Sequence, residues 1–292
     1  MMGLFSKREP CPFCGGKVKG LLPNKIEGRH ICGDCYGNVD LPANATDHMT
    51  LDAFRAYMTF RAENQQLKPQ FQIAQTVDFG WFDTKFVFDT NHRLMCLDKS
   101  LDKTIFEGGQ IKSFVIKEDS TPIFEGSSAG LVCYPSAVPE RLQNMMPQIQ
   151  MFRIQAEMRR GDDDNSFRFD VPEPFKNFNV EIRFEHPYWD VITADMSGPT
   201  FNNDCPDADD YLRDYNRDFA TMEQLARALK QVAFPDAPEQ VVRGVGGVVI
   251  SPTTSNTPVD AVAEIKRYKD LLEQGLITEE EFAAKKKQLL GI

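Results

Sequence analysis

Four of the seven cysteines of this chain lie within its first 35 residues, and their spacing restricts what that segment can fold into. They form two Cys-x2-Cys pairs, Cys11 with Cys14 and Cys32 with Cys35, separated by seventeen residues. This spacing is typical of a zinc ribbon, in which both pairs bind a single ion. Gly15 follows the first pair directly. Because glycine relieves backbone crowding, the amides of such a turn can point at the sulfur atoms.

Four thiolates complete the coordination of one Zn²⁺ and leave no position for water, so we expect a structural zinc ion and not a catalytic one. A segment of this length cannot bury a core of its own, and the metal would supply its folding free energy. A redox Cys-x2-Cys pair and an iron site of the rubredoxin type are the alternatives. His30 lies near the second pair, but four cysteines already suffice, so we interpret it as a surface residue. The predicted ribbon spans residues 1–48.

The net charge of −10 argues against a nucleic-acid surface that covers the whole protein, because such a surface needs excess positive charge. The first 37 residues nevertheless carry six basic and three acidic side chains. Four of these basic residues lie between the cysteine pairs and are candidate nucleic-acid contacts: Lys17, Lys19, Lys25 and Arg29. The alternative is a soluble acidic protein with a few lysines on a small module.

The chain has no stretch close to the roughly 18 apolar residues that a membrane span needs. Its first ten residues also lack the apolar region of a signal peptide. We therefore expect a cytoplasmic protein, in which paired cysteines bind metal more often than they form disulfides. Cys96, Cys133 and Cys205 are isolated in the sequence, and we expect them to be buried packing residues.

Residues 49–69 are expected to form a helix that connects the ribbon to the next domain. Thr50 is a suitable N-cap, Asp52 lies in the first turn, and Pro69 marks the end. Apolar residues recur at helical spacing: Leu51, Phe54, Met58 and Ala62.

Residues 70–232 are predicted to form a central domain rich in strands. Two of these, 85–89 and 93–97, flank Thr90-Asn91-His92, which is a hairpin signature. Alternation of apolar and polar residues predicts further strands with one wet and one buried face, the pattern of an antiparallel sheet. These strands are 111–116, 151–158, 167–169, 180–184 and 190–194.

Two helices are expected in the same domain, one from Val138 to Ile149 and one from Tyr211 to Leu229. Trp81 and Trp189 are expected to be core or interface anchors. The predicted fold class is thus α+β with several domains: a four-cysteine zinc ribbon, a central mainly antiparallel β domain with helices, and a C-terminal helical hairpin. A twisted antiparallel sheet closed by a C-terminal helix resembles the bacterial pleckstrin-homology-like fold, at the level of this pattern alone.

Residues 233–258 are predicted to form a flexible linker, because proline, glycine, serine and threonine dominate this segment. Its glycine-rich part lacks both the last glycine of GxGxxG and the GK[ST] of a phosphate-binding loop. Residues 248–250 are apolar enough to add to an assembly as an edge strand.

Residues 259–292 carry two short helical patterns. The first ends at Gly275, where a helix C-cap favours a left-handed residue. Thr278 and Glu281 then form a capping box, and Ile277 with Phe282 forms a hydrophobic staple. A hairpin this small is not stable alone, so its apolar face needs either a partner or the body of its own chain. The candidate partner-binding residues are Ile265, Tyr268, Leu271, Leu272, Leu276, Ile277, Phe282, Leu289 and Leu290.

The segment from Ile265 to Phe282, IKRYKDLLEQGLITEEEF, resembles the SHOCT module, the short C-terminal domain of many bacterial and phage proteins. The resemblance implies a helical hairpin for oligomerisation or partner docking, without chemistry of its own. The N-terminal segments MGLFSK, CPFCG and ICGDC resemble the zinc-ribbon domain family DUF4428, which often precedes such a module. That second resemblance implies the four cysteines as zinc ligands, and it implies no known activity.

No catalytic constellation stands out in the sequence. Residues 126–130 fit GxSxG, but strand-like residues follow where a nucleophile elbow needs a helix. The four histidines, His30, His48, His92 and His186, show no catalytic or metal-binding spacing, and nothing favours a cysteine–histidine dyad. The acidic clusters at 162–165 and 204–210 do not fit a calcium loop. We therefore predict a protein that is not an enzyme.

The function that these patterns favour is that of a scaffold or adaptor, in which the C-terminal hairpin drives self-association or docking to another protein. The alternative is a nucleic-acid-associated regulator that uses the basic ribbon. An enzymatic activity in the central domain is a third hypothesis, and no residue pattern supports it.

Overall fold

The computed structural model describes residues 9–20, 22–79, 84–158 and 169–242. The chain divides into two compact units, residues 1–251 and 252–292. The second unit contains the predicted hairpin and lies outside the described residues, as do Trp81, the acidic cluster at 162–165 and the strand expected at 248–250. All of the structure that follows belongs to the first unit.

The N-terminal part consists of a short hairpin followed by helices. Strands β1 (Lys25–Ile26) and β2 (Arg29–His30) pair antiparallel. They are followed by α1 (Gly33–Gly37) and the 3₁₀ turn η1 (Ala45–His48), and then by α2 (Leu51–Asn64) and η2 (Gln65–Gln70). A helix is expected over 49–69; α2 forms its first part, and the remainder is η2, which contains Pro69.

A four-stranded antiparallel sheet comes next, in the order β3-β4-β5-β6. Its strands are β3 (Gln75–Phe79), β4 (Thr84–Asp89), β5 (Leu94–Cys96) and β6 (Phe106–Glu107). The predicted hairpin joins β4 to β5, and the buried Asp89 carboxylate caps its turn by accepting from the amides of Asn91 and His92. Arg93 at the end of this turn donates to the carbonyl oxygens of Val232 and Ala233.

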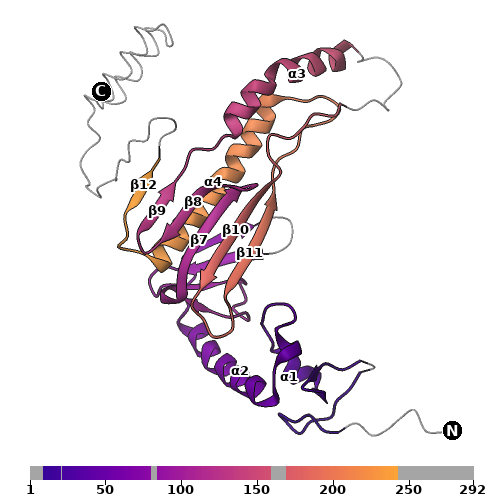
Figure 1. Ribbon diagram of the computed structural model, residues 1–292, viewed down its shortest axis with the longest axis vertical. Coiled ribbons are helices and arrows are strands. Elements are labelled where there is room, and N and C mark those ends of the chain that lie inside the picture. Colours follow the sequence, from indigo (N-terminus) through magenta and orange to yellow (C-terminus); the bar gives the residue numbers. More distant parts are fainter. Residues whose placement is uncertain (1–8, 21, 80–83, 159–168, 243–292) are drawn as a thin grey trace, which may run out of the picture. The chain divides into compact units, whose positions relative to one another are not determined.

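A six-stranded sheet follows, in the order β11-β10-β7-β8-β9-β12 (Figure 1). The 3₁₀ turn η3 (Gly108–Gln110) leads into β7 (Ile111–Glu118), and β8 (Thr121–Ser127) and β9 (Gly130–Cys133) continue the sheet. β10 (Asn177–Phe184) and β11 (Val191–Ser197) extend it on one side, and β12 (Glu239–Val241) on the other. Every pairing is antiparallel except that of β12 with β9.

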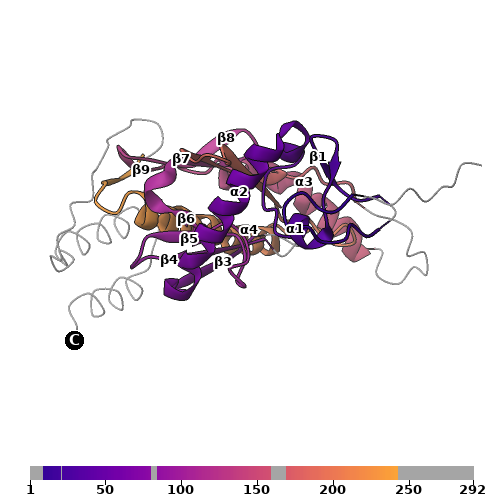
Figure 2. The same cartoon turned by 90° about the horizontal axis from the view of Figure 1, so that it is seen from below.

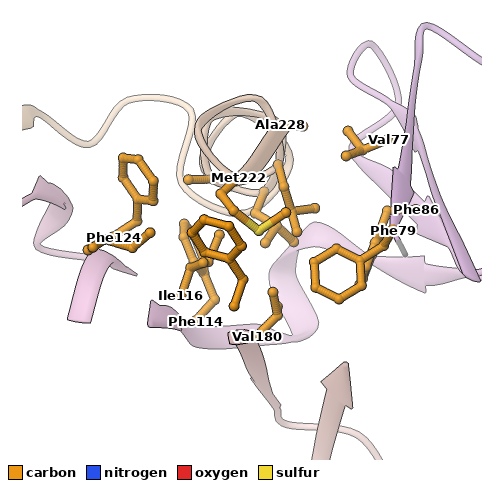
Figure 3. Close-up of a cluster of buried hydrophobic side chains, with 14 of the residues drawn as sticks. Val77, Phe79, Phe86, Phe114, Ile116, Phe124, Val180, Met222 and Ala228 are labelled. Carbon is orange, nitrogen blue, oxygen red and sulfur yellow. The ribbon is translucent and has the colours of Figure 1, made fainter. Parts of the chain in front are cut away.

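Helix α4 (Ala208–Ala233) packs between the two sheets and supplies the middle of the core. Asp207 caps its start by accepting from the amides of Asp209 and Asp210. In Figure 2, β7 and β8 lie on one side and β3 and β4 on the other. Figure 3 shows side chains of both sheets, such as Phe114 and Phe86, converging on Met222 of this helix. The α+β class with a mainly antiparallel body is confirmed.

The strand predicted at 151–158 is wrong. Those residues form the second half of a single helix, α3 (Val138–Met158), which is labelled in Figure 1. The alternation predicted a strand wrongly because none of its apolar members is buried: Ile154 and Met158 are exposed by 53% and 80%, and Phe152 and Ala156 are half-buried. Methionine, glutamine, alanine, glutamate and arginine are all good helix formers, and over eight residues this propensity outweighs the alternation.

The first residues of the expected flexible linker are ordered. After α4 ends, the side chain of Lys230 donates to the carbonyl oxygen of Pro235 at 2.7 Å. β12 then pairs with β9, and the Val242 amide donates to the carbonyl oxygen of Cys133 at 2.8 Å. Residues 238–242 therefore belong to the central domain, because their backbone groups pair with β9.

Candidate metal centre

The first pair of cysteines lies in a tight turn that closes on itself. The Cys11 amide donates to the carbonyl oxygen of Gly16 at 2.9 Å, and the Gly15 amide donates to that of Cys11 at 2.8 Å. Gly15 has a φ of +68°, in the left-handed region that glycine adopts without steric cost. The Gly16 amide points at Cys14 Sγ, 3.4 Å away. The glycines after this pair therefore relieve backbone crowding and let an amide point at a sulfur atom, as the sequence predicted.

The second pair begins a short helix. The turn between β1 and β2 places Glu27 and Gly28 at positive φ, and β2 leads directly to Cys32. Cys32 is the N-cap of α1, and its Sγ accepts from the Cys35 amide at 3.4 Å. The cap geometry thus turns Cys35 back toward Cys32, which brings the two sulfur atoms of this pair together.

The four sulfur atoms converge. The Sγ atoms of Cys11, Cys14, Cys32 and Cys35 all lie within 4.8 Å of one another. Cys14 Sγ and Cys32 Sγ are 3.4 Å apart. A tetrahedral zinc ion with Zn–S bonds of about 2.3 Å requires sulfur–sulfur separations of about 3.8 Å. The observed arrangement fits that requirement, so these four residues form a site that can hold one metal ion, and its chemistry is consistent with zinc.

The thiols of this cluster differ in acidity. Burial opposes ionisation of Cys11, but the backbone amides around it, first that of Cys32, outweigh burial and lower the pKa of the Cys11 thiol to about 6. Burial and then the neighbouring sulfur atoms raise the pKa of Cys35 above its usual value. One thiolate therefore forms easily, whereas four thiolates this close together need a cation to offset their mutual repulsion.

The ribbon shares its small core with α2. Cys11, Ile26 and Cys32 are buried together with Phe54 and Tyr57 of that helix. The rings of Phe13 and Phe54 have their centroids 4.8 Å apart. The carboxylate of Glu27, in the β1–β2 turn, accepts from the Leu51 amide at 2.9 Å and so caps the start of α2; Figure 1 shows α1 beside α2. The connecting helix is therefore structurally part of the ribbon.

Helix α2 also contacts the loop between β10 and β11. Tyr57 and Tyr188 meet edge to face with centroids 5.1 Å apart, and Phe60 meets His186 at the same distance. His186 is buried; its Nδ1 accepts from the Tyr188 amide, and burial lowers its pKa. Sequence reasoning gave His186 and Tyr188 no role here. No pattern of neighbouring residues could have indicated this contact, because His186 and Tyr188 are far from α2 in the sequence and meet it only in the folded chain.

The four candidate nucleic-acid residues are exposed. Lys17, Lys19, Lys25 and Arg29 all lie on the surface of the ribbon. Arg29 forms an ion pair with Glu9 at 2.7 Å, which neutralises part of this basic group. His30 is half-buried at the end of β2, and no ligand atom of it belongs to the metal cluster.

The remaining sequence candidates do not assemble into a catalytic site within the described residues. The GxSxG segment is the turn between β8 and β9, as the strand-like residues after it indicated. Gly126 faces the ring of Phe114, and a Cβ at this position would lie 2.1 Å from it. Cys96 is fully buried, and Cys133 and Cys205 are half-buried. His92 pairs with Asp89 at 2.7 Å in the hairpin turn.

Comparison with known protein families matches residues 263–290 to the short C-terminal domain, SHOCT. The match supports the resemblance seen in the sequence and covers only that segment of the chain. No curated protein and no solved structure matches the chain. The resemblance of the N-terminus to the DUF4428 family, and that of the central domain to the pleckstrin-homology-like fold, stay predictions. Within the described part of the chain, none of the helices combines the length and the apolar character needed to cross a membrane.

Proposed function

We propose that this protein is a non-enzymatic scaffold or adaptor whose C-terminal module drives self-association or docking to another protein. The observation that carries the proposal is the match of residues 263–290 to the short C-terminal domain. A module of that length buries too little apolar surface to be stable alone, so its apolar residues need a surface to pack against.

The N-terminal part of the chain supports the proposal in a different way. A cluster of four cysteines has no open coordination position, so a zinc ion held there would stabilise the ribbon without doing chemistry. The ribbon core continues into α2, and α2 packs on the central domain. A folded body with an attached association module is what a scaffold requires.

Light scattering on the full-length protein tests the proposal. We expect an oligomer that dissociates when two predicted partner-binding residues, Leu272 and Phe282, are changed to aspartate. Lys286→Asp is the matched control, because it changes the charge of the same module without removing an apolar side chain. Zinc content and circular dichroism of each variant check that the body is intact.

The possible results separate the two forms of the proposal. An oligomer that survives the Leu272→Asp and Phe282→Asp changes would contradict self-association through this module. A monomer at all concentrations would leave docking to another protein, which is tested by comparing the proteins that co-purify with the wild type and with the double variant. Identical sets would overturn the proposal.

A further inference from the structure

A hollow of about 560 Å³ lies between the ribbon, α2 and the loop that precedes β6. The segment after α1 contributes Asn38 and Val39, α2 contributes Met58 and Arg61, and the loop contributes Lys103. This volume falls within the range of about 300–1,000 Å³ that is usual for small-molecule sites. The hollow is not part of the metal cluster, and nothing in the proposed scaffold function uses it.

Arg61 is the unusual residue of this hollow, because it is only 6% exposed. Its guanidinium donates to three neutral oxygens: the carbonyl oxygen of Asp102 at 2.7 Å, and, at 3.4 Å each, the carbonyl oxygen of Asn38 and the side-chain oxygen of Asn64. A guanidinium has five N–H donors, so two of them are left over. These three bonds hold the group in one orientation.

No carboxylate in the described part of the chain forms an ion pair with Arg61. The two acidic side chains at the hollow already have lysine partners: Asp40 pairs with Lys103 at 3.4 Å, and Asp102 pairs with Lys68 at 2.7 Å. The Asp102 carboxylate also attracts Arg61, and with Lys68 and Lys103 the three cations around the hollow exceed its two carboxylates by one positive charge. A buried charge whose counter-charges are shared with other cations is costly, and an anion that reaches it recovers part of that cost.

We propose that this hollow binds a small organic anion, with a carboxylate or phosphate group on Arg61. Arginine matches both groups through paired N–H donors, and its pre-set orientation reduces the entropy that binding costs. Lys103 lies at the rim and pairs with Asp40 there, so that this carboxylate does not repel an anion. Met58 and Val39 provide half-buried apolar surface for the remainder of the ligand.

Calorimetric titration of the full-length protein tests this site with three probes of similar size: benzoate, phenyl phosphate and benzyl alcohol. We expect saturable binding of at least one of the two anions and none of the neutral alcohol. A preference between benzoate and phenyl phosphate then identifies the anionic group. Equal binding of the alcohol and the anions, or no saturable binding of either anion, would overturn the proposal.

Two variants and a control locate the binding. Arg61→Gln should weaken anion binding by about ten- to a hundredfold, the loss expected for a charged hydrogen-bonding group. Because this change affects a buried residue, Lys103→Gln at the rim is the second variant, with a smaller loss expected. Arg55→Gln is the matched control on the same helix: Arg55 is exposed, pairs with Asp52 and does not line the hollow. Equal losses in the control and in the rim variant would contradict the site.

Discussion

The side chain of Asn64 and the backbone of Ile105 form a reciprocal pair of hydrogen bonds. Asn64 Nδ2 donates to the carbonyl oxygen of Ile105 at 2.7 Å, and the Ile105 amide donates to Asn64 Oδ1 at 3.0 Å. Both residues are buried. A single amide side chain at the end of α2 thus satisfies a backbone donor and acceptor of the central domain, as a neighbouring strand would.

We expect Asn64→Ala to destabilise the protein by about 2 kcal/mol or more, because it leaves a buried N–H and a buried C=O without partners. Urea unfolding of the full-length variant measures this change in the free energy of unfolding. Asn38→Ala is the control, since its side chain makes one exposed bond, to the carbonyl oxygen of Asp34. Its effect should stay within about 0.5 kcal/mol. Equal effects would mean that the Asn64 pair does not hold α2 to the central domain.

The cluster of four cysteines predicts one zinc ion per chain. We expect Cys14→Ser to lose the metal and to unfold the ribbon, because three sulfur ligands and a hydroxyl hold zinc more weakly. Elemental analysis by mass spectrometry gives the zinc content, and limited proteolysis shows whether the ribbon is folded. Cys205→Ser, outside the cluster, should keep one zinc ion per chain. A wild-type protein without zinc, or a Cys14→Ser variant that keeps it, would contradict the assignment.

The buried carboxyl group of Glu118 should make stability fall as the pH rises. It accepts from Tyr215 at 2.5 Å and from Ser136 at 2.9 Å, but burial is the larger effect and raises the pKa of Glu118. In the unfolded chain the group titrates near pH 4.3, so above that pH the folded state binds more protons than the unfolded state. The contribution of Glu118 to stability is therefore fully present below the pKa of the unfolded state. It is lost as the pH rises through the pKa of the folded state.

Glu118→Gln removes this titration and keeps an oxygen that can accept from Tyr215. We expect its free energy of unfolding, relative to the wild type, to increase as the pH rises above the unfolded pKa of about 4.3. Urea unfolding at several pH values measures the difference. Glu140→Gln, at an exposed position in the first turn of α3, is the control and should show a change within about 0.5 kcal/mol. A difference for Glu118→Gln that does not depend on pH would show that its burial does not control its titration.

The GxSxG segment can be tested as a packing feature. We expect Gly126→Ala to destabilise the protein by about 1–3 kcal/mol, because the added Cβ would lie 2.1 Å from the Phe114 ring. Gly109→Ala, where the Cβ meets nothing within 4 Å, should change stability by no more than about 0.5 kcal/mol. Thermal unfolding of both variants provides the comparison. A neutral Gly126→Ala would mean that the sheet accommodates the side chain by a local shift.

The nucleic-acid alternative makes an opposite prediction to the scaffold proposal. If the ribbon binds nucleic acid through phosphates, affinity must fall steeply with salt and must be lost when Lys17, Lys19 and Lys25 are changed to glutamine. With Arg29 paired to Glu9 and a net charge of −10, we expect no salt-dependent binding of either DNA or RNA in a fluorescence anisotropy titration. Salt-dependent binding by the wild type that the triple variant loses would favour the regulator.

Local sequence patterns predicted the structure correctly wherever the interactions join residues that are close together in the sequence. The Cys-x2-Cys turns, the hairpin at Asp89 and the N-cap Thr50 each rest on residues a few positions apart. The same local reasoning failed at 151–158, because apolar alternation indicates a strand only when one face is buried, and burial is a property of the assembled fold.

The sequence by itself determined the cluster of four cysteines, the α+β class and the match to the short C-terminal domain, since ligand spacing, turn residues and capping residues act within a few bonds of one another. Only the tertiary structure decided how α2 joins the ribbon to the central domain. It also decided that Glu239 and its neighbours extend the sheet and that Arg61 lies buried at a hollow. Those features depend on pairs such as Asn64 with Ile105, which are 41 positions apart and carry no signal until the core brings them together.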